Sequence, residues 1–457
     1  MKTNLPVQFK EKTHEGATAA RTNAEQQLRR SVMACLLWET GFYESGIAVA
    51  DRIKDLVEKC SPDVVAKIAI EARSKQHLRH IPLLIVRHMA ALATHKHLVA
   101  KTLAEVIQRP DELAEFIAIY WKEGRCPVSA QVKKGLAKAF PKFNEYSLAK
   151  YNQDGAVKLR DVLFICHASP DSRYADIGSG LVVERTYKNG SKKKILRHAD
   201  SLYAKIVNQT LKTPDTWEVS LSGGADKKEV FERLMSEEKL GGLAFLRNLR
   251  NMQEAGVNTS LVAQYSQVVK LDRVLPFRFI AAARAVPIWE PMIEMMMLRS
   301  LADQPKLPGK TVIVVDNSGS MNGAKVSEKS DIDRSDAACA LAILIREIAE
   351  EPVIIGFGTH AAIVPARRGF ALAEAIKRGP GGGTKTQKAL DLASLQGYDR
   401  IIVITDEQSH QQISAPKCQK AYFVNVAVCK NGIGYGPWTH IDGWSESILD
   451  YIRSVED

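Results

Sequence analysis

The hydrophobic pattern of this 457-residue chain changes near residue 310. Before that point, apolar residues recur at the spacing of amphipathic helices, starting with a helix that opens at a capping box of Thr22 and Glu25. After it, continuous apolar runs such as 311–315 and 400–405 predict strands buried on both faces of a parallel sheet. These strands alternate with helical segments, which predicts a C-terminal α/β doubly wound domain.

Four prolines give the helical part a repeat. Pro62 and Pro110 each open a helical segment and lie 48 residues apart, and Pro82 and Pro127 do the same 45 residues apart. Proline is favoured in the first turn of a helix, and a two-helix period of this length is typical of HEAT repeats. The pattern therefore predicts an N-terminal all-α HEAT-like solenoid, with a non-repetitive helical domain as the alternative.

Turn-forming residues suggest the domain boundaries of a multidomain chain. Residues 1–21 are polar and predict a flexible N-terminus, and residues 22–302 form the helical part. The run DQPKLPG predicts a linker over residues 303–309, followed by the α/β domain over 310–457. Within the helical part, residues 213–226 are rich in turn formers and predict a non-helical connection.

Oxygen-bearing side chains gather where the predicted strands of the α/β domain end. The first strand runs into the sequence DNSGSM, and ligands of open α/β sheets collect at the carboxyl ends of strands. A glycine-rich loop and the strand RIIVIT end in further oxygen donors. Carboxylates and hydroxyls are hard ligands suited to Mg²⁺, whereas a serine-rich turn that caps a helix is the alternative. The predicted metal ligands are Asp316, Ser318, Ser320, Thr384 and Asp406.

Composition adds an uneven charge. The net charge is +11, but residues 301–457 carry 17 Lys and Arg against 19 Asp and Glu, so residues 1–300 carry an excess of +13. A basic helical part suggests a polyanionic partner such as nucleic acid, although solvated helix faces alone also produce such an excess. The seven cysteines form no C-x-x-C pair, and no apolar run reaches membrane-spanning length. We therefore expect reduced cysteines, no membrane contact and a cytoplasmic location.

Basic residues are interleaved with aromatic residues between Lys133 and His198. Lysines can neutralise phosphates, and aromatic faces can stack on unpaired bases. The alternative is that the aromatic residues are core and the lysines a solvated face. Asn189-Gly190-Ser191 marks a turn inside the second basic cluster, which predicts a mobile loop there. The candidate RNA-binding lysines are Lys133, Lys134, Lys138, Lys150, Lys192, Lys193 and Lys194.

Several longer motifs resemble those of the Ro ribonucleoprotein family, which joins a TROVE module to a von Willebrand A-like domain. They include KIAIEARSKQHLRHIP, KLRDVLFICHASP, LGGLAFLRNLRNM and the DNSGSM loop, and they occur in order along nearly the whole chain. The resemblance implies a ring of helical repeats and a metal-ion-dependent adhesion site formed by the five predicted ligands. It also implies binding of structured small non-coding RNA on the outside of the ring and of single-stranded RNA ends in its central hole.

The resemblance places Lys150 and His167 at RNA-contacting positions, whereas Asp154 stands where the family has an arginine. From its apolar neighbours alone, His167 would be a core histidine. No H-E-x-x-H, G-x-S-x-G or complete Walker A motif is present, so we expect a protein that is not an enzyme. The leading hypothesis is an RNA-binding scaffold for RNA quality control or processing. The alternative is a metal-dependent module that captures an acidic side chain of a protein partner, and a metal-dependent nuclease is a third possibility.

Overall fold

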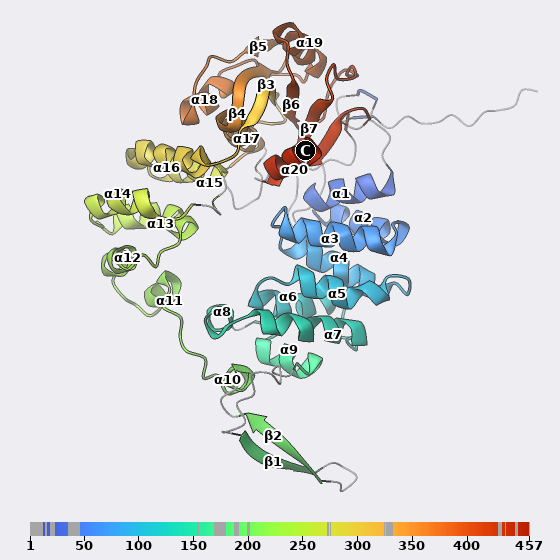
Figure 1. Ribbon diagram of the computed structural model, residues 1–457, viewed down its shortest axis with the longest axis vertical. Coiled ribbons are helices and arrows are strands. Elements are labelled where there is room, and N and C mark those ends of the chain that lie inside the picture. Colours follow the sequence, from blue (N-terminus) through green and yellow to red (C-terminus); the bar gives the residue numbers. More distant parts are fainter. Residues whose placement is uncertain are drawn as a thin grey trace, which may run out of the picture. The chain divides into compact units, whose positions relative to one another are not determined.

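The computed structural model confirms the predicted fold class, with helices in the N-terminal part and an α/β domain at the C-terminus (Figure 1). The chain forms two compact units, one of Met1–Arg52 with Thr216–Asp457 and the other of Ile53–Asp215. The domain boundaries taken from the sequence divide the chain differently and stay a prediction. The structure describes residues 12–13, 16–18, 23–34, 46–152, 155–168, 180–186, 192–198, 202–271, 274, 276–323, 325, 332–427, 432–434, 436–443 and 447–456.

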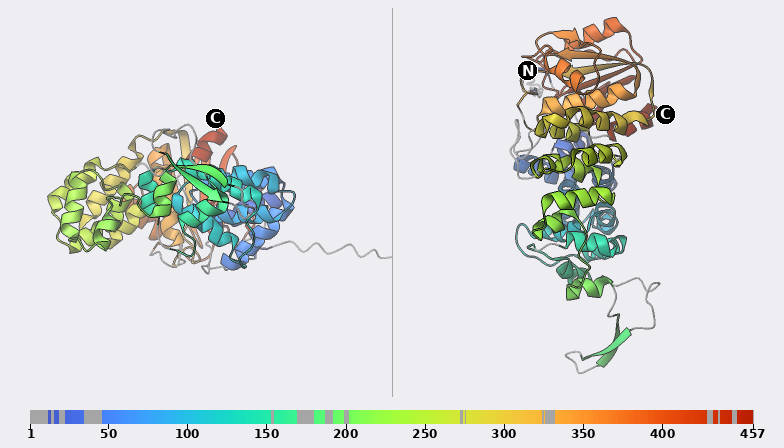
Figure 2. Two further views of the ribbon diagram at one scale, coloured as in Figure 1. Left: turned by 90° about the horizontal axis from the view of Figure 1, so that it is seen from below. Right: turned by 90° about the vertical axis from the view of Figure 1, so that its left-hand side faces the viewer.

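The unit of residues 53–215 is a stack of helices followed by a strand pair (Figure 1, Figure 2). Helices two places apart in the chain pack together: α3 against α5, α5 against α7, α7 against α9, and α4 against α6. This two-layer packing is that of HEAT-like helix pairs. The helices are α2 (Gly46–Lys59), which crosses the unit boundary, α3 (Pro62–Ser74), α4 (His80–Ala91), α5 (Lys96–Val106), α6 (Pro110–Tyr120), α7 (Ala130–Ala139), η1 (Phe140–Lys142), α8 (Glu145–Tyr151), α9 (Leu159–Cys166) and α10 (Leu202–Asn208).

The helix starts in this unit agree with the proline pattern at two of four positions. Pro62 and Pro110 are the first residues of α3 and α6. Pro82 lies inside the first turn of α4, which begins two residues earlier, and Pro127 precedes α7, whose N-cap is Ser129. A hydroxyl that accepts the Val132 N–H at 3.4 Å thus starts α7, so proline only marks the connection there.

The other unit combines helix α1 with the end of the helical part and the α/β domain. Helix α1 begins with a capping box in which Asn23 and Gln26 bond to each other's backbone N–H. This box lies one residue later than the predicted one of Thr22 and Glu25. Thr22 lies outside the described residues. Helix α11 occupies part of the stretch predicted to be non-helical, where Thr216 caps it. The helices are α1 (Ala24–Ala34), α11 (Trp217–Ser222), α12 (Lys227–Ser236), α13 (Gly242–Glu254), α14 (Thr259–Val268), α15 (Pro276–Ala285), η3 (Pro287–Trp289), α16 (Glu290–Ala302), α17 (Arg334–Ile348), α18 (Gly369–Lys377), α19 (Thr386–Gln396) and α20 (Ser447–Glu456).

The α/β domain contains a six-stranded sheet in the order β5-β4-β3-β6-β7-β8. Neighbouring strands are parallel except for the edge strand β5, which is antiparallel to β4. The continuous apolar runs predicted as strands therefore form its centre, as buried parallel strands require. The strands are β3 (Leu307–Asp316), β4 (Ala349–Phe357), β5 (Ala361–Ile363), β6 (Arg400–Thr405), β7 (Lys420–Asn425) and β8 (Thr439–Asp442), and β1 (Gly180–Thr186) with β2 (Lys192–His198) form the separate antiparallel pair.

Side chains of β3 alternate between two cores on opposite faces of this sheet. Ile313 and Val315 belong to a core shared with α17, α20 and the helices α12 to α16, whereas Val312 and Val314 pack with α19. The last helices of the helical part are thereby joined to the α/β domain by one continuous hydrophobic core. This core gives the sheet a rigid central strand, and that strand carries the predicted metal site.

Two details of the predicted organisation are corrected. Strand β3 begins at Leu307, so the second half of the predicted linker 303–309 is part of the sheet. Thr13 and Ala17 are only 4% and 6% exposed, so these two residues do not belong to a flexible N-terminus. In the described part of the chain, no helix is long and apolar enough to span a membrane.

Candidate metal centre and nucleic-acid surface

The predicted metal ligands lie at the carboxyl ends of two neighbouring strands. Asp316 is the last residue of β3, and Asp406 directly follows β6, which pairs in parallel with β3. The register of the two strands sets Thr405 beside Asp316, and the Thr405 hydroxyl donates to Asp316 Oδ2 at 2.5 Å. Sheet pairing therefore brings together two carboxylates that are 90 residues apart in the sequence.

The DNSGSM loop folds back over these carboxylates. The Ser318 backbone N–H donates to Asp316 Oδ1 at 2.8 Å, which turns the loop directly after the strand. The Ser318 and Ser320 hydroxyl oxygens are 3.3 Å apart, and the Ser320 hydroxyl donates to Asp406 Oδ2 at 2.5 Å. Four of the five predicted ligands are therefore linked by hydrogen bonds in one cluster.

Thr384 is the fifth predicted ligand. Its loop contacts both the DNSGSM loop and the loop that follows β6. Its carbonyl accepts hydrogen bonds from the His410 N–H at 3.1 Å and the Ser409 hydroxyl at 3.3 Å. The Gly319 N–H in turn donates to the Gly382 carbonyl at 2.8 Å. The three strand-end loops of the sequence prediction are thus adjacent in the fold, with Thr384 only 2% exposed.

The two carboxylates are buried side by side. Asp316 is 1% exposed and Asp406 is fully buried, and burial together with the neighbouring Asp406 charge raises the pKa of Asp316 to about 7. The hydroxyl donors stabilise the negative charges of Asp316 and Asp406 only in part. A cation bound between the two carboxylates would offset their mutual repulsion. No group of three or more His, Cys, Asp or Glu side chains able to hold a metal occurs among the described residues, so this oxygen-rich cluster differs from a zinc-type site.

Sequence reasoning did not find the groups that surround this cluster. Thr405 could have been noticed, because a threonine that ends a strand before the aspartate is a local signal. Glu407, which follows Asp406, pairs with Arg30 of α1 across 377 residues of sequence. Nothing in the sequence around either residue indicates that contact.

The first candidate RNA-binding lysines lie on helix α7. Lys134 and Lys138 are exposed and are separated by four residues, so they share one helix face, while Lys133 is half-buried. Lys142, also in this basic stretch, instead binds the carbonyls of Ala104 and Ile107 at the end of α5. The α7 pair is therefore available to a polyanion, whereas the ammonium group of Lys142, an exposed residue as well, is engaged by backbone carbonyls.

The second group lies on α8 and α9. Lys150 Nζ is 5.8 Å from the ring centroid of Tyr151, and the Arg109 guanidinium lies 4.5 Å from the same centroid. His167 ends α9 in the left-handed conformation, with φ 53°, and its side chain is exposed. The interpretation of His167 as a core histidine is therefore wrong, because its helix ends one residue earlier. Asp154 lies outside the described residues.

The third group, Lys192, Lys193 and Lys194, was expected in a mobile basic loop. The structure places all three at the start of β2, paired in antiparallel register with Thr186, Arg185 and Glu184 of β1. The loop prediction is wrong at these positions, because backbone pairing in the sheet outweighs the local turn signal. The turn residues 189–191 lie outside the described residues.

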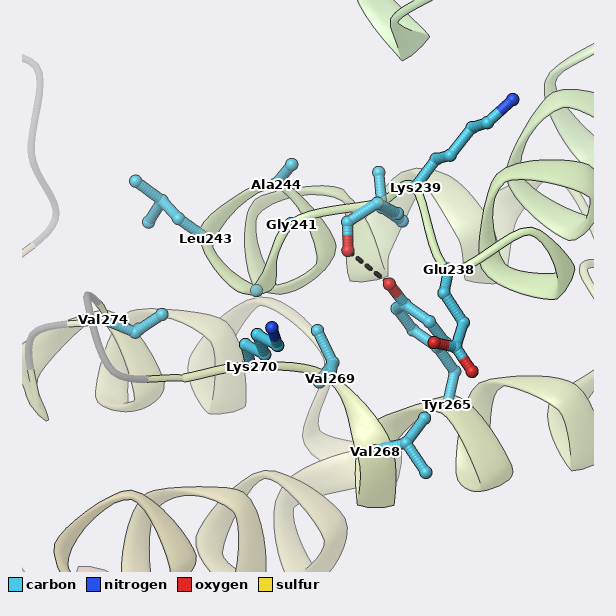
Figure 3. Close-up of a pocket in the computed structure, with 12 residues that line it drawn as sticks. Glu238, Lys239, Gly241, Leu243, Ala244, Tyr265, Val268, Val269, Lys270 and Val274 are labelled. Atoms are coloured by element: carbon cyan, nitrogen blue, oxygen red, sulfur yellow. Dashed lines mark hydrogen bonds between the residues drawn. The ribbon is translucent and has the colours of Figure 1, made fainter.

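An open cavity of about 640 Å³ lies between the start of α13, the end of α14 and the segment before α15 (Figure 3). Leu243, Val268 and Val274 give it apolar walls, and the Tyr265 hydroxyl donates to the Leu240 carbonyl at 2.5 Å on one side. Gly242 allows this arrangement, since a Cβ there would lie 2.3 Å from the Lys270 carbonyl oxygen.

Comparison with known proteins gives three findings. A family model described as the TROVE domain matches residues 208–294. Telomerase protein component 1 of Rattus norvegicus is 24% identical over 334 residues, which cover 56% of this chain and 13% of that protein. The Mus musculus protein of the same name is 38% identical over 78 residues, or 16% of this chain and 3% of that protein. The chain thus spans only a small part of the length of these relatives.

A solved structure resembles nearly the whole chain. The crystal structure of the Deinococcus radiodurans RO (RSR) protein matches with a TM-score of 0.61 over 94% of this chain and 99% of that chain, at 16% identity. At this level of identity the likeness concerns the fold. It agrees with the order of elements described above, in which a helical part precedes an α/β sheet domain.

Proposed function

We propose that the chain is a member of the Ro ribonucleoprotein family and acts as an RNA-binding scaffold that binds structured small non-coding RNA and single-stranded RNA ends. The TROVE-domain match over residues 208–294 and the likeness of fold to the Deinococcus radiodurans RO (RSR) protein support this proposal. The observation that carries the proposal is the exposed lysine pair of α7 in a helical part with a charge excess of +13. Phosphate contacts by such lysines supply sequence-independent affinity, and nearby exposed aromatic and histidine side chains can contact unpaired bases. A role in RNA quality control or processing follows from this binding.

The proposal does not include catalysis. Asp316 and Asp406 are the pair of carboxylates that contact the loop hydroxyls, and the adjacent Glu407 carboxylate is engaged by Arg30 and His440. Metal-dependent nucleases of the two-metal type need more carboxylates than this pair supplies. We therefore place RNA binding, and not RNA cleavage, at the centre of the function.

We propose that the cluster at the strand ends binds Mg²⁺. Asp316, Ser318, Ser320, Thr384 and Asp406 would hold the ion, and the residues fit it because two buried carboxylates face hydroxyls and no softer ligand. When bound, Mg²⁺ supplies a hard Lewis-acid position that can accept a carboxylate oxygen. This supports a second function of the same chain, in which an acidic side chain of a protein partner docks at the α/β domain.

The lysine pair of α7 gives the first test of RNA binding. We expect the Lys134→Ala/Lys138→Ala double variant to weaken binding of a hairpin RNA and of a single-stranded RNA alike, because it removes two phosphate contacts. The slope of log affinity against log salt should fall by about 1.5. Filter-binding titrations at several salt concentrations measure both quantities.

The matched control is Lys227→Ala/Lys228→Ala, which removes the same charge from the exposed first turn of α12. This control should bind both RNAs within about twofold of the wild type if only local phosphate contacts matter. Equal losses in the two double variants would mean that general charge, and not the α7 face, determines affinity. If neither double variant loses RNA affinity, the assignment of RNA binding to the outer surface of the helices is wrong.

Lys150 and His167 give the second test. Lys150→Ala removes one phosphate contact and should lower the salt slope by about one. His167→Ser removes an exposed ring that can stack or donate a hydrogen bond, so it should weaken a hairpin RNA more than a single-stranded tail. The two RNAs are compared in the same filter-binding assay. If both variants bind both RNAs like the wild type, these two residues are only part of a solvated face.

A further inference from the structure

Three buried ionisable side chains, Arg30, Glu407 and His440, meet directly behind the proposed metal site. Arg30 of α1 donates from Nη1 to Glu407 Oε2 at 2.5 Å, and His440 of β8 pairs through Nε2 with Glu407 Oε1. The side chains of Arg30, Glu407 and His440 are 1%, 0% and 6% exposed. Because burial of an unpaired carboxylate is costly, the position of Glu407 depends on the arginine that α1 supplies.

The backbone around Glu407 is shaped for this contact. Glu407 has φ 61°, a left-handed conformation that is uncommon for a residue with a side chain. A Cβ at Gly432 would lie 1.9 Å from Glu407 Oε2, and a Cβ at Gly434 would lie 2.1 Å from Oε1. A larger residue at either position would therefore have to displace the Glu407 carboxylate from its contacts with Arg30 and His440.

A second contact of the N-terminal region lies two residues further along the same loop. The Thr13 hydroxyl donates to the Ser409 carbonyl at 2.9 Å and accepts from the Ala17 N–H at 3.0 Å. Ala17 is buried in the core that contains Val312 and Val314 of β3. Thr13 and Arg30 therefore hold residues 407 and 409 from two separate points of the chain.

This loop also positions the predicted metal ligands. The Gln408 N–H donates to Asp406 Oδ1 at 3.1 Å, and the Glu407 N–H donates to Thr405 Oγ1 at 3.1 Å. The Thr405 hydroxyl in turn donates to Asp316. The backbone of this loop therefore supports Asp406 directly, through Gln408, and Asp316 indirectly, through Thr405. Moving Glu407 or Ser409 would shift these donors away from the carboxylates.

We infer that the docking of Thr13 and Arg30 onto residues 407–409 is coupled to Mg²⁺ binding at Asp316 and Asp406. Arg30 acts as a positioning residue, because it contacts Glu407 and not the ion. The inference rests on the proposed Mg²⁺ site. Coupling is reciprocal, so the ion must also stabilise the docked α1. The N-terminal region is then a regulatory element of the metal site, and a partner that displaced it would release the ion.

The test compares Mg²⁺ affinities of full-length variants by calorimetry. Arg30→Met should weaken Mg²⁺ binding about tenfold, because the loop that carries Asp406 loses its partner in α1. Thr13→Val keeps the shape of the side chain and removes the hydroxyl, and with it the hydrogen bonds to Ser409 and Ala17. No ion pair is lost, so a smaller loss of about threefold is expected. Arg29→Met is the matched control, since Arg29 pairs with Glu25 within α1 and its side chain is 34% exposed. This variant should bind Mg²⁺ like the wild type.

Hydrogen exchange of the α1 amides gives the reciprocal measurement. Mg²⁺ should slow this exchange in the wild type and leave it unchanged in Asp316→Ala, whereas a merely structural role of Arg30 would make α1 exchange independent of Mg²⁺. If Arg30→Met does not fold, Thr13→Val and the exchange data decide.

The outcomes separate the two proposals. Wild-type Mg²⁺ affinity in both Arg30→Met and Thr13→Val would overturn the coupling and leave the metal site standing. A wild-type protein that binds no Mg²⁺ would overturn the metal site and the coupling with it. Weakened binding in these two variants but not in Arg29→Met, with Mg²⁺-dependent α1 exchange, would support both.

Discussion

Alanine at position 316 is expected to abolish Mg²⁺ binding to this protein. Asp316 is one of two buried carboxylates in the strand-end cluster, and without it Asp406 and the serine hydroxyls supply a single negative charge. Mg²⁺ gives up its water ligands reluctantly, so one carboxylate with hydroxyls is a poor site. Calorimetric titration of Asp316→Ala should show no heat of Mg²⁺ binding where the wild type gives a full isotherm.

RNA affinity should change little in the same variant, because the candidate RNA-binding lysines belong to the unit of residues 53–215. Asp391→Ala, which removes an exposed carboxylate of α19, is the control and should bind Mg²⁺ like the wild type. Unchanged Mg²⁺ binding in Asp316→Ala would disprove the site assignment. A parallel loss of RNA affinity would mean that RNA, and not a protein partner, uses the metal site.

The second large effect is expected for Glu112→Ala in the stacked helices. Glu112 is fully buried; Oε1 accepts from Arg73 Nη2 at 2.6 Å, and Oε2 accepts the N–H groups of Gln108 and Arg109 at 2.8 and 3.0 Å. Burial raises the pKa of the Glu112 carboxyl, and the two amides and the Arg73 charge oppose that rise. The residue thus caps α6 and neutralises a buried arginine of α3.

Removal of one partner of such a pair leaves an uncompensated buried charge, so Glu112→Ala should lower the free energy of unfolding by about 3–5 kcal/mol. Urea-dependent hydrogen exchange of the α3 and α6 amides measures this loss locally. Glu58→Ala, at an exposed position of α2, is the control and should change stability by less than about 0.5 kcal/mol. A loss below about 1 kcal/mol in Glu112→Ala would show that the ion pair between Arg73 of α3 and Glu112 of α6 contributes little to stability.

Local patterns in the sequence determined the element types and most of the proposed metal site. The apolar run before Asp316 is a central strand because parallel strands are buried on both faces, and such strands place the residue after them at one common edge. Asp316, Ser318, Ser320 and Asp406 could be predicted together for this reason. Proline likewise marked the starts of α3 and α6, because its ring is compatible with the first turn of a helix.

Only the tertiary structure decided which charged side chains pair over long distances. The sequence presents Lys134 and Lys142 as equivalent members of one basic stretch, yet the tertiary structure brings the Lys142 ammonium group to the carbonyls of Ala104 and Ile107 at the end of α5. Arg30 and Glu407 carry no local signal of their contact, since a buried ion pair forms where packing excludes water and not where the neighbouring sequence favours it. Short-range propensities and caps depend on a few adjacent residues, whereas desolvation depends on every element packed around a side chain. This is why the contacts of the N-terminal region with the proposed metal site emerge only from the fold.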